Sequence, residues 1–216
     1  MYSTLFILAS ALFALCCRLA TRFPAGSFAT ILGYWVLLSA GVELVGGVIL
    51  LFGGSNALLY IVFCALEFVL LVLLAKAARG GTGKWTWVVI GAFLMLWAVN
   101  LCSIWGGDSF VTYAFMVGAL WLCGLYLQRL WDLVNSWSGN LSASPQFWLC
   151  LTVVLYFGAG APLLGSVNYF YDFDPALAKK IFMGVRALCV LKFILMGITC
   201  LHMRNASNPT TDGPRT

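Results

Sequence analysis

Seven long apolar segments run through the chain, each near the roughly 20 residues that a helix needs to cross a bilayer. They cover residues 2–20, 27–53, 56–77, 85–105, 110–130, 147–167 and 180–203. Only 9% of the 216 residues are charged, whereas a soluble domain carries roughly 25%. The segments are continuously apolar, which favours helices over the alternating strands of a barrel. The sequence therefore predicts an all-α polytopic membrane protein with seven transmembrane helices.

Lysine and arginine are unevenly distributed between the predicted loops. One side has only Lys179 and Lys180, and the other has eight: Arg18, Arg22, Lys76, Arg79, Lys84, Arg129, Arg204 and Arg215. Because positively charged loops stay in the cytoplasm, we predict that the N-terminus is outside and the C-terminus inside. Residues 1–204 form one predicted transmembrane domain, and the polar residues 205–216 a disordered cytoplasmic tail. No basic run is long enough for a nucleic-acid site, so the bilayer is the first expected partner.

Four ionisable residues fall inside the apolar segments, where a charge is costly and marks a functional site by default. They are Glu43, Glu67, Arg186 and Lys192. At 1.5 Å per residue they lie roughly 14, 16, 9 and 18 Å below the outer ends of their helices. The four residues are therefore expected at similar depth. A short turn at residues 53–55 should also make the second and third helices antiparallel neighbours.

Two interpretations of these charges stay open. They could form buried ion pairs that tie the second and third helices to the seventh, or they could line a ligand or catalytic pocket. Arg186 and Lys192 are about 120° apart in helical projection, so they should not share one partner directly. A lysine in a seventh helix with a carboxylate on the third also invites a retinal Schiff base. The residues VLKFILMG around Lys192 do not resemble that motif, so this interpretation is not favoured.

Other candidate groups are few. Asn100 and Tyr60 could add hydrogen bonds to the polar cluster, although such residues usually link membrane helices. The single histidine, His202, excludes a metal or haem site built from several histidines. The eight cysteines all fall in apolar segments, where they fill space. The sequence thus identifies no catalytic residue, no metal site and no cofactor.

Three stretches carry a resemblance to a known family. They are Glu43-Leu44-Val45-Gly46, the run NALLYIVFCALEFVLL that contains Tyr60 and Glu67, and the run SPQFWLCLTVVLYFGAG. The chain resembles a family of small seven-helix membrane proteins of Bacteroidetes-type bacteria, often described as hypothetical or histidine-kinase-associated. The resemblance implies that Glu43 and Glu67 belong to the family pattern and that Lys192 is peculiar to this chain. It carries over no activity.

With almost no mass outside the membrane, the chain is expected to act through another membrane protein. We predict a non-enzymatic sensor or interaction module in a bacterial inner membrane. The alternatives are a structural subunit of a larger membrane complex, a lipid-active enzyme that uses Glu43 and Glu67 as acid and base, and a small-solute transporter. A sensor should have a pocket that opens outward without a path to the other side. An enzyme should have a water-accessible cavity that holds both glutamates.

Overall fold

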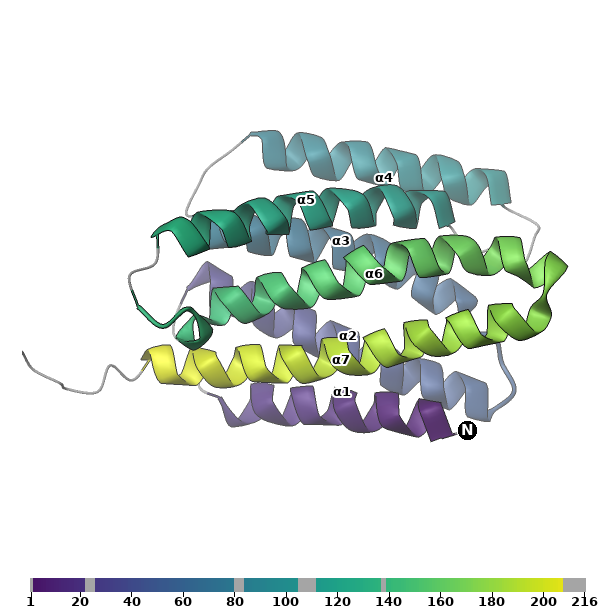
Figure 1. Ribbon diagram of the computed structural model, residues 1–216, viewed down its shortest axis with the longest axis horizontal. Helices are drawn as coiled ribbons and strands as arrows, with labels where there is room; N and C mark the ends of the chain where they lie inside the picture. The colour runs from purple at the N-terminus through teal and green to yellow at the C-terminus, as the bar shows by residue number, and fades with distance from the viewer. Residues whose placement is uncertain (1, 22–25, 80–83, 105–111, 137–138, 208–216) are drawn as a thin grey trace, which may run out of the picture.

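The computed structural model describes residues 2–21, 26–79, 84–104, 112–136 and 139–207, and no strand occurs in these ranges. Its elements are α1 (Tyr2–Ala20), α2 (Ser27–Leu51), α3 (Ala57–Arg79), α4 (Trp85–Ile104), α5 (Thr112–Ser136), the 3-10 turn η1 (Leu141–Ala143), α6 (Pro145–Phe173) and α7 (Pro175–Ser207). The helices lie along one common direction (Figure 1). Within the described residues each of the seven apolar segments forms a helix, so the all-α prediction is confirmed.

The lengths of the helices and the apolar outer surface of the bundle identify a multi-pass membrane protein. Helices α2 to α7 are each long and apolar enough to cross a bilayer, and the apolar stretch of α1, Thr4–Ala20, is somewhat shorter. Large apolar side chains are exposed on the outside of the bundle, among them Phe6, Leu58, Met95 and Leu120. A soluble monomer rarely exposes so much apolar surface, whereas lipid tails cover it without cost.

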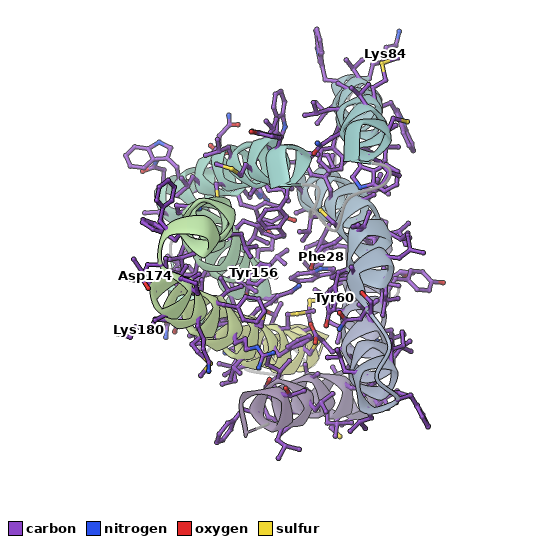
Figure 2. The ribbon with its side chains drawn as sticks, turned by 90° about the vertical axis from the view of Figure 1, so that its right-hand side faces the viewer. Phe28, Tyr60, Lys84, Tyr156, Asp174 and Lys180 are labelled. Carbon is purple, nitrogen blue, oxygen red and sulfur yellow. The ribbon has the colours of Figure 1, made fainter. Side chains whose placement is uncertain are left out.

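Six helices form a closed ring. Each of α1, α2, α3, α5, α6 and α7 packs against the next, and α7 returns to α1 (Figure 2). Helix α4 stands outside this ring and packs against α3 and α5. It is held there by Phe93, whose ring stacks on Phe68 of α3 with the centroids 3.7 Å apart. The ring arrangement leaves an interior onto which six helices project side chains.

The turn between α2 and α3 fixes the register of the two helices that carry the glutamates. Gly53 has a positive φ of 74°, which glycine adopts at little cost. The Gly54 N–H donates to the Ile49 carbonyl at 2.9 Å, and the Gly53 N–H donates to that of Leu50 at 3.1 Å. This pair of bonds is the Schellman motif that ends many helices. The predicted antiparallel packing of α2 against α3 is confirmed.

The turn between α6 and α7 is shorter than predicted. The apolar segments 147–167 and 180–203 predict a loop over residues 168–179, but α6 continues to Phe173 and α7 begins at Pro175. Asp174 interrupts the helix because the proline after it disfavours a helical conformation at this position. Its Oδ1 then accepts bonds from the N–H groups of Ala176 and Leu177, both at 3.0 Å, and caps α7. Helix α7 runs to Ser207, and the rest of the predicted tail lies outside the described residues.

Candidate functional site

A cavity of about 520 Å³ lies inside the ring, toward the end where α1 and α7 begin. Its mouth is bordered by Thr4, Leu50, Asn56, Ala57 and Phe182, which come from the ends of α1, α2, α3 and α7 nearest that side. Tyr60 and Tyr156 point into the interior from α3 and α6 (Figure 2). All four intramembrane ionisable residues line this one cavity: Glu43, Glu67, Arg186 and Lys192.

The deepest charged group is an ion pair between helices α3 and α7. Lys192 Nζ donates to Glu67 Oε1, and both side chains are about 95% buried. The indole Nε1 of Trp35, on α2, donates to the same oxygen at 2.9 Å. Helices α2, α3 and α7 are thus joined at one carboxylate. The pairing that the sequence left open for Lys192 is with Glu67.

Aromatic rings also lie close to the Lys192 ammonium. The Nζ atom lies 4.5 Å from the ring centroid of Tyr156 and 5.3 Å from that of Phe63. The rings of Trp35 and Phe193 are both at 5.8 Å. Ring faces attract a cation within about 6 Å, and more strongly where water is excluded. The aromatic residues therefore help to keep this charge inside the membrane domain.

A second acidic group lies nearer the mouth. Tyr60 donates its hydroxyl to Glu43 Oε2 at 2.8 Å, which joins α3 to α2. Gly46 makes room for this contact, since a Cβ there would lie 3.2 Å from the Tyr60 hydroxyl oxygen. Glu43 also interacts electrostatically with Lys192 and Arg186. The two glutamates thus have different hydrogen-bond partners, although they share one cavity.

The remaining two candidate residues, Arg186 and Asn100, lie in different parts of the structure. Arg186 lines the cavity wall on the mouth side of Lys192, with its guanidinium 5.0 Å from the ring centroid of Phe182. Asn100 is not among the lining residues. Its Oδ1 accepts a bond from the Ala114 N–H at 3.1 Å and so links α4 to α5. Asn100 therefore serves helix packing in this structure.

The cavity is closed at its floor in the part of the chain that the structure describes. Ser39, Glu67, Tyr156 and Lys192 are the deepest polar residues of the lining. About one turn further from the mouth, each of their helices places a side chain that is at most 1% exposed: Trp35, Leu71, Val153 and Met196. These side chains fill the interior at that level. The cavity is therefore a pocket with one open end.

Sequence reasoning missed Ser39 in the pocket lining and Trp35 just below the floor, whose indole donates to Glu67. In the sequence, Trp35 resembles the other tryptophans of the apolar segments, and no neighbouring residue indicates that it donates to a carboxylate. Ser39 reads as a packing residue. The available signal was spacing, because Trp35, Ser39 and Glu43 recur every four residues and so share one face of α2.

No protein-family model, curated protein or solved structure matches this chain. The geometry is therefore the basis for any statement about function. It provides a pocket with apolar walls, two acids, two bases and several hydrogen-bonding groups, which is the usual make-up of a small-molecule site.

Proposed function

We propose that this protein is a non-enzymatic membrane sensor that takes a small molecule into the cavity and passes its occupancy to a partner protein. The observation that carries the proposal is the one-ended pocket around the Glu67–Lys192 pair. Its volume lies within the roughly 300–1,000 Å³ of small-molecule sites. Six helices of the ring line it, so a ligand would contact several helices at once.

The closed floor agrees with sensing, because the described residues show no path from the pocket to the other end of the bundle. A transporter needs access from both sides in turn, commonly through repeated halves that rock about the site. Here Leu71, Val153 and Met196 close the interior below the pocket, each with 0% exposure. Binding at such a site can change helix packing, and a change of that kind requires different affinity for two arrangements of the bundle.

The distribution of charge between the loops indicates which side of the membrane the pocket mouth faces. With the N-terminus outside and all seven helices crossing, the pocket mouth faces the exterior of a bacterial inner membrane. In this proposal the output of the sensor belongs to another membrane protein.

A lipid-active enzyme is the second candidate, because the cavity holds both Glu43 and Glu67. The contacts favour it less. Glu67 is engaged by a lysine and a tryptophan and Glu43 by a tyrosine, so neither carboxylate is presented as an unoccupied acid or base. Turnover of lipid by the purified chain alone would overturn the sensor and establish the enzyme.

The test of ligand binding uses the full chain in lipid nanodiscs. The protein is incubated with a small-molecule extract of bacterial cells, washed and denatured, and the released compounds are identified by mass spectrometry. Ala57→Trp places a large ring at the mouth, and Leu58→Trp is the matched control because Leu58 is 69% exposed and outside the lining.

We expect a compound to be retained by the wild type and by Leu58→Trp but lost from Ala57→Trp. Retention of nothing by the wild type, or equal retention by Ala57→Trp, would contradict the proposal. Purification in mild detergent should in addition recover a membrane protein in fixed stoichiometry.

A further inference from the structure

The Ser39 hydroxyl is a buried polar group without a hydrogen-bond partner among the described residues. Ser39 is 1% exposed and lines the floor of the cavity. Hydroxyls in membrane helices usually donate to a carbonyl one turn back. Thr152 and Thr199 do so here, at 2.7 and 2.8 Å. An unsatisfied buried hydroxyl is costly, so Ser39 has a hydrogen bond to offer to a group inside the cavity.

The ion pair beside Ser39 also has unused hydrogen-bonding capacity. An ammonium has three donors, and in the described part of the chain Lys192 Nζ uses one of them, on Glu67 Oε1. Trp35 donates to that same oxygen, so no described residue donates to Glu67 Oε2. Nearer the mouth, Tyr60 occupies Oε2 of Glu43. The floor therefore offers donors at Ser39 and Lys192, and the two glutamates offer acceptors.

The formal charges in the cavity sum to zero. Glu43 and Glu67 balance Arg186 and Lys192, and these are the charged residues of its lining. A ligand with a net charge would bring an uncompensated charge between apolar walls, which is unfavourable. A ligand with one positive and one negative group keeps the balance and satisfies both kinds of hydrogen-bonding group.

The apolar part of the cavity wall favours a ligand that also has an apolar part. Ile7, Leu8, Phe63, Leu164, Val185 and Phe193 line the cavity between the polar groups. A small hydrophilic zwitterion would leave this surface facing water, whereas one with an aliphatic or aromatic side chain would cover it.

We propose that the cavity binds a zwitterionic amphiphile, with its acid group on Ser39 and Lys192, its ammonium on Glu43, and its apolar part along the wall. This inference rests on the proposed ligand-binding function. The chemistry is shared by free apolar amino acids and by the headgroup of phosphatidylethanolamine, which the experiment separates.

The test measures equilibrium binding to the nanodisc-embedded chain by calorimetry. The probes are leucine, valine, methionine and phenylalanine, each with its N-acetyl derivative as matched anion and its amide as matched cation. Dihexanoyl phosphatidylethanolamine forms the lipid arm, with dihexanoyl phosphatidylglycerol as its anionic control. The zwitterionic probe that binds more tightly, amino acid or phosphatidylethanolamine, identifies the source of the ligand.

We expect the tightest probe to be a zwitterion, with its charged derivatives weaker by roughly tenfold or more. Glu43→Gln leaves the cavity with one excess positive charge, so the matched anion should then bind more tightly than the zwitterion. Ser39→Ala should weaken the zwitterion by roughly three- to tenfold without lowering the unfolding midpoint, because Ser39 has no described partner to lose.

A charged derivative that binds the wild type more tightly, or an unchanged order of affinities in Glu43→Gln, would overturn the ligand class. If no probe binds, the ligand class is tested by the compound that the wild type retains from the cell extract. A zwitterionic compound supports the inference, and a compound with a net charge overturns it. Retention of no compound from the extract by the wild type would instead refute the proposed function itself, and this inference with it.

Discussion

Replacing Lys192 with methionine should destabilise the protein strongly. The substitution conserves side-chain length and most of the volume, so little of the cost comes from packing. It leaves the Glu67 carboxylate about 95% buried without its cation. Breaking a buried pair by removing one partner costs about 3–5 kcal/mol. The bond from Trp35 remains, so we expect a value near the lower end, about 3 kcal/mol.

The assay is reversible unfolding in mixed micelles by titration with dodecyl sulfate, followed by tryptophan fluorescence. The double change Glu67→Gln with Lys192→Met removes both charges and should recover more than half of the loss. Leu191→Met is the matched control, because Leu191 is 36% exposed on the outer face of α7 and should change stability by no more than about 0.5 kcal/mol. A single Lys192→Met variant as stable as this control, or a double variant no more stable than the single one, would refute the ion pair as a structural element.

Three further predictions follow from other parts of the molecule. Tyr126→Phe removes the hydroxyl that donates to the Leu71 carbonyl at 2.9 Å, and thermal denaturation in detergent should show a loss of about 0.6–1.7 kcal/mol; no loss would contradict this role. Gly118→Val places a Cβ 2.6 Å from Phe93 and should cost about 1–3 kcal/mol by the same measurement, whereas Gly91→Val, with nothing within 4 Å, should lose much less. An alkaline phosphatase fused after Thr216 should be inactive, since loop charge predicts a cytoplasmic C-terminus; an active fusion would contradict this topology.

The fold could be predicted well because the bilayer leaves few options. Backbone polar groups must be satisfied inside each segment, so continuous apolar runs identify helices directly. The ends were harder to place. Helix α6 continues to Phe173, and composition alone does not distinguish such an aromatic-rich helix end from a loop.

The site could be predicted only in part. Because the rise per residue of a helix is fixed, the sequence predicts a similar depth for Glu43, Glu67, Arg186 and Lys192. All four line one cavity in the structure. Depth does not give rotation, so the partner of Lys192 stayed open. Asn100 was grouped with these residues by polarity, but α4 stands outside the ring, and only the tertiary arrangement shows that. Ser39 could not be singled out because its distinguishing feature is a missing hydrogen bond.

The native cysteines provide the most direct test of the pocket. Cys64 and Cys189 line the cavity, whereas Cys150 and Cys200 are buried at 1% and 0% exposure outside its lining. The folded chain in nanodiscs is treated with iodoacetamide, and each cysteine is quantified by peptide mapping. The account predicts that Cys64 and Cys189 are alkylated well before Cys150 and Cys200, and that Ala57→Trp slows the first pair alone. Equal rates at all four positions, or no effect of Ala57→Trp, would contradict a water-accessible pocket that ends at the Glu67–Lys192 pair.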